Sequence, residues 1–219
     1  MDDDRLWAQV SAERQDLLTL LQELRPAEWE TPTLCDGWRV RDVVGHLTMA
    51  TDTPLSSAVV GMVRAGFDVD RFLRRTAVQR GSAPLTTLLS GWHRAVTSRR
   101  TPPGGTPGQM LVEVVSHTQD LRRPLDRPRA TPPEHLRCAL DTAVRLGGPF
   151  GSRQRATGLR LVAPELDWTA GEPSAPEVRG PGDALLLGML GRAGVHGELT
   201  GPGVARWSGA SEPGRPAVG

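Results

Sequence analysis

The stretch LVEVVSHTQDLRRPL, residues 111–125, is typical of a helix that begins after a proline- and glycine-rich loop and ends before Pro124. Its residues are largely apolar, yet it contains Glu113 and His117, which stand four residues apart. Side chains at that spacing lie on one face of a helix, with about 5–6 Å between their Cβ atoms. The stretch therefore predicts a helix that turns two side chains of the metal-binding type in the same direction.

Several further segments have the apolar spacing of amphipathic helices. The acidic start of the first segment suits the positive end of the helix dipole, and Pro84 suits the first turn of another. We expect about four long helices with shorter pieces between them, a pattern typical of a helical bundle. Besides the opening stretch, helical patterns cover residues 3–24, 40–50, 56–66, 68–80, 84–99 and 132–146.

The pattern changes after Gly147. GLRLVAPELDWTAG, residues 158–171, alternates apolar and polar positions and predicts two short strands. GPGDALLLGMLGR, residues 180–192, predicts a short apolar helix, and ELTGPGVARW, residues 198–207, predicts a strand, a turn and a strand.

These elements together predict an α+β protein with two domains. We expect a four-helix bundle in residues 1–150 and a small α+β domain in residues 151–208. The last residues, 209–219, are rich in glycine, proline and serine, and we expect them to be disordered.

The composition disfavours several classes of function. Lys+Arg number 26 against 25 Asp+Glu, so the net charge of +1 supplies no overall field to hold a nucleic acid. No P-loop, dinucleotide fingerprint or serine nucleophile elbow is present. No segment is apolar enough over sufficient length to span a bilayer, and no secretion signal is evident, so we expect a cytoplasmic protein with reduced cysteines, without a membrane or nucleic-acid partner.

A metal needs more ligands than Glu113 and His117. His46 is the best third candidate because it flanks the apolar stripe of another predicted helix, and neighbouring helices can direct such side chains to one point in a bundle. Two imidazoles and one carboxylate match a catalytic zinc site that keeps one position open. The same set also matches the iron(II) site of oxygenases, so the ligand types alone do not select the metal.

Structural alternatives remain open for each of these residues. A glutamate four residues before a histidine occurs by chance in many helices, and His46 alone also fits a half-buried, hydrogen-bonded histidine. Cys35 has no base at a recognisable spacing and fits a small buried loop residue better than a nucleophile. The arginine pair 122–123 fits a solvated helix end, although an anionic substrate could use it.

Separate segments of the chain resemble one known family. TPTLCDGWRVRDVVGHL, residues 31–47, is similar to the N-terminal signature of the mycothiol-dependent maleylpyruvate isomerase family, which is related to the DinB-like metal-binding bundles. EVVSHTQDLRRPL, residues 113–125, resembles its second signature. The segments 158–168, 178–192 and 198–204 resemble its small C-terminal domain, so the resemblance covers nearly the whole chain in the right order.

The resemblance implies a DinB-like bundle with a divalent metal, usually zinc, held by His46, Glu113 and His117. It also implies that Arg192 faces the active-site cleft and binds a carboxylate. One departure is Arg39, which stands where family members often have serine or threonine as a helix cap. We therefore expect another cap, or none, at this helix start.

The resemblance further implies mycothiol, a low-molecular-weight thiol of high-GC actinobacteria, as cosubstrate. All 26 basic residues are arginine and lysine is absent, which fits a GC-rich source. The resulting hypothesis is that a metal-bound thiolate attacks a small electrophile, with isomerisation, S-transfer or thiol exchange as the outcome. Asp120 would support a metal-binding histidine or form a structural salt bridge.

Two other functions explain the same ligands. One is a metal-binding bundle without catalysis that regulates or binds a partner, and the other is a metal-dependent hydrolase that activates water. An open coordination position together with thiol-dependent turnover would distinguish the enzyme from both. The sequence leaves the electrophile undefined, and it is compatible with a monomer or a homodimer.

Overall fold

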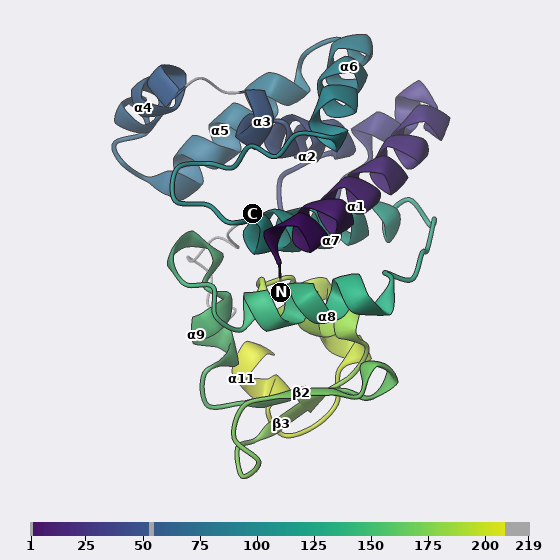
Figure 1. Cartoon of the computed structure of the whole chain (residues 1–219), viewed down its shortest axis with the longest axis vertical. Helices are drawn as coiled ribbons and strands as arrows, with labels where there is room; N and C mark the ends of the chain where they lie inside the picture. The colour runs from purple at the N-terminus through teal and green to yellow at the C-terminus, as the bar shows by residue number, and fades with distance from the viewer. Residues whose placement is uncertain (1, 53–54, 209–219) are drawn as a thin grey trace. The chain divides into compact units, whose positions relative to one another are not determined.

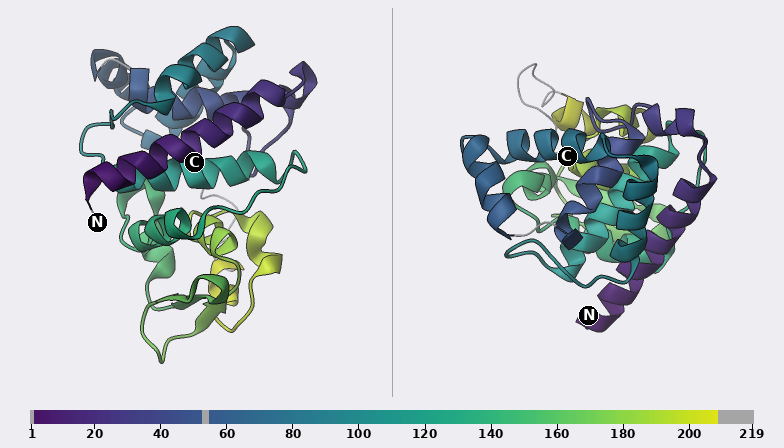
Figure 2. Two further views of the ribbon diagram at one scale, coloured as in Figure 1. Left: turned by 45° about the vertical axis from the view of Figure 1, so that its right-hand side comes forward. Right: turned by 90° about the horizontal axis from the view of Figure 1, so that it is seen from above.

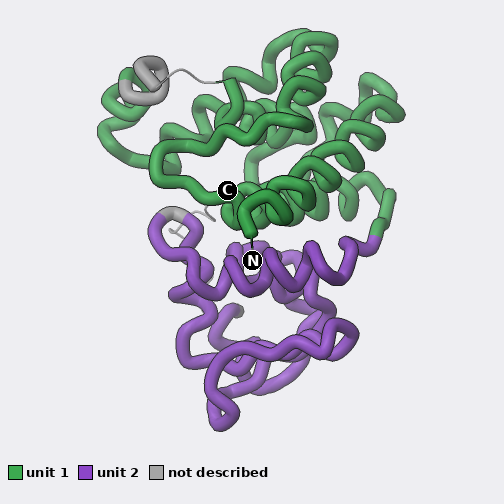
Figure 3. The backbone as a smooth tube through the Cα atoms, viewed as in Figure 1, with its two compact units in different colours: residues 1–129 green, residues 130–219 purple. Residues whose placement is uncertain are grey.

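The chain forms two compact units, Met1–Arg129 and Ala130–Gly219 (Figure 3). This computed structural model describes residues 2–52 and 55–208, so the tail expected to be disordered, 209–219, lies outside the described residues. The units divide earlier than the boundary expected near residue 150. The reason is that the helix predicted at 132–146 packs with elements of the second unit, to which it belongs.

Among its described residues, the first unit consists of helices and loops with one isolated bridge between Pro32 and Arg39, as the apolar spacing predicts for a helical unit. Pro84 stands at the N-cap of α6 rather than in its first turn. The helices are α1 (Asp3–Glu23), α2 (Val40–Leu47), α3 (Met49–Asp52), α4 (Leu55–Arg64), α5 (Val69–Gly81), α6 (Leu85–Val96) and α7 (Pro107–Arg122), with the short 3-10 helix η1 (Pro26–Glu30) between α1 and α2 (Figure 1).

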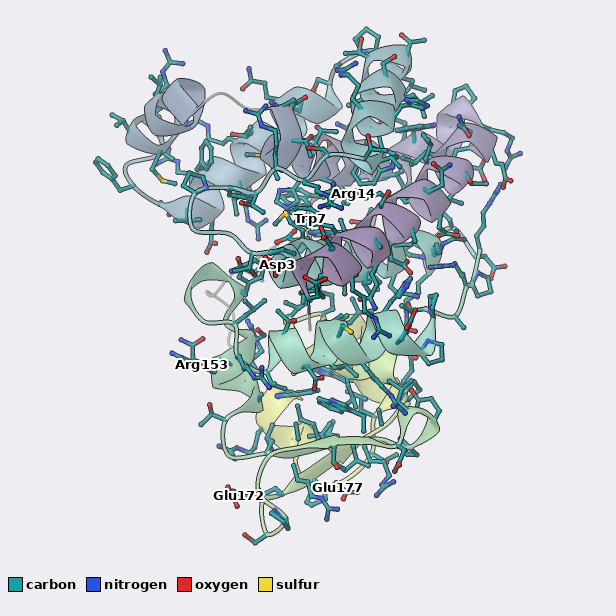
Figure 4. The ribbon with its side chains drawn as sticks, viewed as in Figure 1. Asp3, Trp7, Arg14, Arg153, Glu172 and Glu177 are labelled. Atoms are coloured by element: carbon teal, nitrogen blue, oxygen red, sulfur yellow. The ribbon has the colours of Figure 1, made fainter. Side chains whose placement is uncertain are left out.

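Helix α1 packs against α6 and lies alongside α7 (Figure 2). Its apolar face is buried, and it also buries Arg14, which Figure 4 shows on this helix. The Arg14 guanidinium donates hydrogen bonds to the carbonyls of Ala95 and Ser98 at the end of α6, both at 2.8 Å. The indole Nε1 of Trp92 donates a hydrogen bond to the Arg14 carbonyl at 3.2 Å. Burial lowers the pKa of Arg14 to about 10, which leaves it charged at neutral pH.

Helix α7 is buried along most of its length and begins at a well-formed cap. The Thr106 side chain accepts from the Gln109 amide at 3.3 Å, and Gln109 Oε1 accepts from the Thr106 amide at 2.7 Å. This reciprocal pair satisfies two amide groups at the helix start. The Gln109 side chain is therefore engaged in capping the start of α7.

The end of α7 and the segment that follows it are fixed to α1 by ion pairs. Arg122 lies 2.8 Å from Asp16, and Arg129 lies 2.7 Å from the buried carboxylate of Glu13. Arg129 also approaches Asp16 at 3.1 Å. Arg122 is thus a structural residue that orients α7, instead of the solvated helix end considered from the sequence.

Helices α2 and α5 cross at unusually short range because glycines face each other there. A Cβ at Gly45 would lie 2.8 Å from the Gly81 amide nitrogen and 3.0 Å from the Ala77 carbonyl. A Cβ at Gly81 would lie 2.8 Å from the Asp42 Cα and would overlap its carboxylate. Side chains therefore cannot separate the two backbones, and this crossing sets the position of α2.

The start of α2 has a cap that the sequence left undefined. The Arg39 amide donates to Asp42 Oδ2 at 3.0 Å, and the Arg39 guanidinium binds the same carboxylate at 2.9 Å. Asp42 is almost fully buried. The carboxylate of the third helical residue thus satisfies the Arg39 amide, which is the half of a capping box that needs no serine or threonine at position 39.

The second unit combines helices with a small sheet, and the predicted α+β class is confirmed. Strand β1 (Arg160–Ala163) pairs antiparallel with β2 (Trp168–Ala170) and parallel with β3 (Glu177–Arg179), in the order β2-β1-β3. β1 and β2 are the two strands predicted within 158–171, whereas β3 was not predicted. The helices are α8 (Pro133–Ala143), α9 (Ser152–Ala156), α10 (Gly182–Met189) and α11 (Val204–Ser208), with the 3-10 helices η2 (Gly148–Phe150), η3 (Pro164–Leu166) and η4 (Ala193–Glu198).

The strand, turn and strand predicted for 198–207 is wrong. Only an isolated bridge joins Thr200 to Arg179, and the segment then forms α11. The reason is Trp207, which is buried and donates from Nε1 to the Arg155 carbonyl at 2.9 Å. That tertiary anchor overrides the local alternation from which the second strand was inferred. Within the described residues, no helix combines the length and the apolar character needed to cross a bilayer.

Candidate metal centre

Three polar side chains from two helices meet in the first unit. His46 comes from α2, and Glu113 and His117 come from successive turns of α7. Glu113 Oε2 lies 3.3 Å from His46 Nε2 and 3.3 Å from His117 Nε2. The centroids of the two imidazole rings are 5.1 Å apart, and the angle between the ring planes is 73°. The sequence singled out these three residues, and the fold brings all three together.

The separations fit a single small cation. Two nitrogen or oxygen ligands that each lie about 2.0–2.1 Å from a tetrahedral zinc ion are about 3.3–3.4 Å apart. Both separations from Glu113 Oε2 are 3.3 Å, and the ligand atoms of all three residues lie within 4.8 Å of one another. The donor set of two imidazoles and one carboxylate also suits zinc. The residues present therefore fit a divalent metal.

The other nitrogen of the His117 ring faces a second group of side chains. His117 Nδ1 lies 2.9 Å from Asp120 Oδ2, and Cys35 Sγ donates to the same oxygen at 3.0 Å. Cys35 Sγ is also 3.6 Å from His117 Nδ1. All three residues are buried, and Asp120 is fully so. An ionised carboxylate only accepts hydrogen bonds, so His117 Nδ1 carries the proton in this contact.

Cys35 is a small buried side chain, as expected from the sequence, but it also contacts the site. No sequence pattern connects Cys35 to His117, because 82 residues separate them. The backbone makes the connection: the Leu34 amide donates to the Asp120 carbonyl at 3.2 Å, which joins this loop to α7.

A tight turn presents this loop to the helices. The Trp38 amide donates to the Cys35 carbonyl at 3.0 Å, and Gly37 has a φ of +76°. Thr33 Oγ1 accepts from the Cys35 amide at 3.2 Å and contacts the Trp38 carbonyl at 3.0 Å. The sequence TPTLCDGW therefore builds a turn that holds the thiol and the indole beside α7.

Because Gly37 occupies the left-handed region, we expect Gly37→Ala to lower the free energy of unfolding by about 1–2 kcal/mol. Gly37→Asn should lose less, since asparagine tolerates this backbone conformation better than alanine. Chemical denaturation of both variants measures the difference. Equal stability of the alanine and asparagine variants would contradict a backbone origin for the effect.

The Trp38 ring covers both histidines. Its centroid lies 5.0 Å from that of His46 and 6.2 Å from that of His117. Trp38 is buried, and its Nε1 has no hydrogen-bond partner among the described residues. A buried N–H without an acceptor is energetically costly, so this indole is a donor available to a ligand.

The charges of the cluster favour a bound cation. Burial alone would raise the pKa of Glu113, but hydrogen bonds and attraction from His117 and His46 hold it well below its usual value. Burial would lower the pKa of His117, but Cys35, Asp120 and Glu113 together raise it well above its usual value. Glu113 is thus ionised, and a proton and a metal ion compete for His117 Nε2.

Arg192, the second cysteine and the other histidines lie outside this cluster. Arg192 belongs to the second unit, where it is buried and its guanidinium donates to the Leu190 carbonyl at 2.9 Å. Cys138 is a buried core residue of α8. His93 and His135 take no part in the potential metal-binding groups found among the described residues, and neither does His196.

Known proteins share both the domain and the fold. Residues 10–101 match the family model described as the mycothiol maleylpyruvate isomerase N-terminal domain. This chain carries that family's N-terminal domain. The resemblance noted in the sequence is thereby confirmed. The matched region includes the Cys35 turn and His46 and ends before α7. No curated protein matches the chain.

Two solved structures have a similar fold over nearly the whole chain. One is a mycothiol-dependent maleylpyruvate isomerase, and the other is a histidine-to-alanine mutant of a mycothiol-dependent maleylpyruvate isomerase. Each is 15% identical in sequence and matches with a TM-score of 0.60, covering 99% of this chain and 96% of its own. The maleylpyruvate isomerase fold therefore extends beyond the matched N-terminal domain into the second unit.

Proposed function

We propose that this protein is a mycothiol-dependent enzyme that holds a divalent metal, most simply Zn²⁺, through His46, Glu113 and His117. Its reaction would be the isomerisation of a small electrophile or the transfer of a thiol to it. The observation that carries the proposal is the convergence of three ligand-type side chains at separations of 3.3 Å around Glu113 Oε2. The N-terminal domain family and the fold similarity support the thiol as cosubstrate.

Three protein ligands suit catalysis better than a purely structural role. Structural zinc sites are closed by four protein ligands, whereas catalytic sites leave a position for water or substrate. Among the described residues, the potential metal-binding group around Glu113 contains only the two histidines besides it. When bound there, the metal would stabilise the thiolate form of a thiol, which is otherwise a minor species at neutral pH.

The residues of the chain would perform the remaining tasks. Glu113 supplies negative charge that offsets part of the cation's charge, and the Trp38 ring shields the two imidazoles from water. The Trp38 N–H could donate to a ligand. We also propose that Arg192 binds a carboxylate of the electrophile, a role that rests on its position in the motif resembling the C-terminal domain of the family.

The proposed reaction balances without an oxidant or reductant. The thiol gives up its proton, and its sulfur forms a bond to a carbon of a conjugated double bond, whose π bond breaks. In an isomerase the resulting single bond rotates, the sulfur–carbon bond breaks, and the thiol recovers a proton. In a transferase the sulfur–carbon bond persists, and the electrophile takes up a proton or loses a leaving group.

The test combines metal analysis with thiol-dependent turnover. We expect the purified protein to retain about one divalent ion per chain, and native mass spectrometry to detect mycothiol bound only to the metal-loaded form. A conjugated electrophile with a free carboxylate should be converted in the presence of mycothiol, and its ester should be converted more slowly if Arg192 acts as proposed.

Each alternative gives a different result. Turnover without any thiol would support the hydrolase, and tight metal binding with neither thiol binding nor turnover would support a non-catalytic bundle. Either outcome contradicts the proposed enzyme. Removal of the metal with a chelator should abolish turnover, and adding Zn²⁺ back should restore it, whereas activity that survives complete removal contradicts the role of the metal.

A further inference from the structure

His117 is shared by two groups of side chains that could each hold a metal. One group is His46, Glu113 and His117, and the other is Cys35, His117 and Asp120. The first uses Nε2 of the His117 ring, and the second uses Nδ1. The two nitrogens are distinct, and the hydrogen bond at one fixes what the other can bind.

We infer that Cys35 and Asp120 are positioning residues for His117 and do not bind the metal themselves. This inference rests on the proposed metal site and adds a role for the loop that precedes α2. Asp120 Oδ2 accepts a hydrogen bond from His117 Nδ1, and the Cys35 thiol donates a second hydrogen bond to the same oxygen. The His117 ring is thereby held with Nε2 directed at Glu113 and His46.

The distances distinguish hydrogen bonding from coordination. Ligand atoms around one tetrahedral zinc ion would be about 3.4 Å apart for nitrogen and oxygen, and about 3.6 Å apart for sulfur and oxygen. The observed distances to Asp120 Oδ2 are shorter, 2.9 Å from His117 Nδ1 and 3.0 Å from Cys35 Sγ. Both are ordinary hydrogen-bond lengths, so the cluster fits a shared acceptor better than it fits a shared cation.

The tautomer gives a second argument. With its proton on Nδ1, neutral His117 presents a lone pair at Nε2, which lies 3.3 Å from the ionised Glu113 Oε2. Two lone pairs at that distance repel each other unless a cation lies between them. The hydrogen bond to Asp120 therefore prepares Nε2 for a metal, and a carboxylate in this position also raises the basicity of a ligating histidine.

Cys35 adds to this arrangement in a way that Asp120 alone does not. Asp120 is completely buried, and a buried carboxylate needs several donors to be stable. The Cys35 thiol supplies one of them on the oxygen that faces His117. The hydrogen bond from the Leu34 amide to the Asp120 carbonyl fixes the loop at the same point of α7. The turn formed by residues 35–38 thus helps to orient His117 without providing a metal ligand.

The experiment measures metal affinity and coordination, and it needs neither thiol nor turnover. Wild-type protein loaded with Co²⁺ should show visible bands of nitrogen and oxygen coordination without a thiolate-to-cobalt charge-transfer band. Asp120→Asn should weaken Zn²⁺ binding, measured by competition with a chelator, by about 10–100-fold. Cys35→Ala should weaken it by a smaller factor, and Cys35→Ser, which keeps a hydrogen-bond donor, should recover part of that loss.

Cys138→Ala is the matched control, because it removes a buried thiol from α8 in the other unit and should leave the affinity unchanged. A thiolate band in wild-type protein that disappears in Cys35→Ser would overturn the inference, since Cys35 would then be a ligand. Unchanged affinity in both Asp120→Asn and Cys35→Ala would also overturn it. Neither outcome contradicts the proposed function, which fails separately if wild-type protein binds no divalent metal.

Discussion

Replacing any one of the three clustered side chains should remove the metal. We expect His46→Ala, Glu113→Ala and His117→Ala each to weaken divalent-metal binding by more than about 100-fold, a larger loss than is typical for residues that only support a ligand. The physical reason is that two remaining protein ligands cannot define a tetrahedral site. Thiol-dependent turnover should be lost in parallel, while the helices persist because alanine is the strongest helix former.

Metal content by elemental analysis and helicity by circular dichroism check this expectation. His135→Ala is the matched control, since it removes a buried histidine from α8 and should leave the metal in place. Glu113→Gln tests the charge separately from the shape, and it should also lose metal because a neutral amide offsets none of the cation's charge. Full metal content in all three alanine variants would show that the site lies elsewhere.

Replacing Gly81 with alanine should destabilise the first unit strongly. The new Cβ would meet the Asp42 backbone, with only 2.8 Å to its Cα, so α2 and α5 could no longer cross at this distance. Overpacking of this kind typically costs about 1–3 kcal/mol. Because α2 carries His46 and would have to move, metal affinity should fall as well. Denaturant titration and chelator competition measure the two effects.

Gly91→Ala separates this effect from the general replacement of a helix glycine. Gly91 also lies in a helix of the first unit, but a Cβ there would be 3.7 Å from its nearest neighbour, an ordinary contact. Alanine at this position should be neutral or stabilising by up to about 1 kcal/mol, because it lowers the entropy of the unfolded chain. Equal stability of the Gly81 and Gly91 variants would contradict the close crossing of α2 and α5.

The sequence determined the elements that local patterns control. The long helices follow from apolar periodicity, and the Thr106 cap and the positive φ of Gly37 follow from residue types with strong local preferences. The pair Glu113 and His117 could also be predicted, because the helical repeat alone places both on one face. Local periodicity does not identify His46 as a third ligand. That prediction depends on assuming that α2 packs beside α7 in a bundle, or on the family resemblance.

Local patterns failed where a distant partner decides the structure. Residues 198–207 alternate like strands, but burial of Trp207 selects a helix for the last part of the segment. Helix α8 has an ordinary amphipathic pattern, which does not reveal that its apolar face packs in the second unit. A pattern shows that a face is buried, but it does not show against what.

By itself, the sequence determined which residues have ligand chemistry and which face of α7 carries two of them. Only the tertiary structure decided that His46 reaches Glu113 and that Cys35 shares an Asp120 oxygen with His117. The physical reason is one of distance along the chain. Helical repeats relate neighbours within a few residues, whereas contacts across 67 and 82 residues depend on how helices and loops pack together.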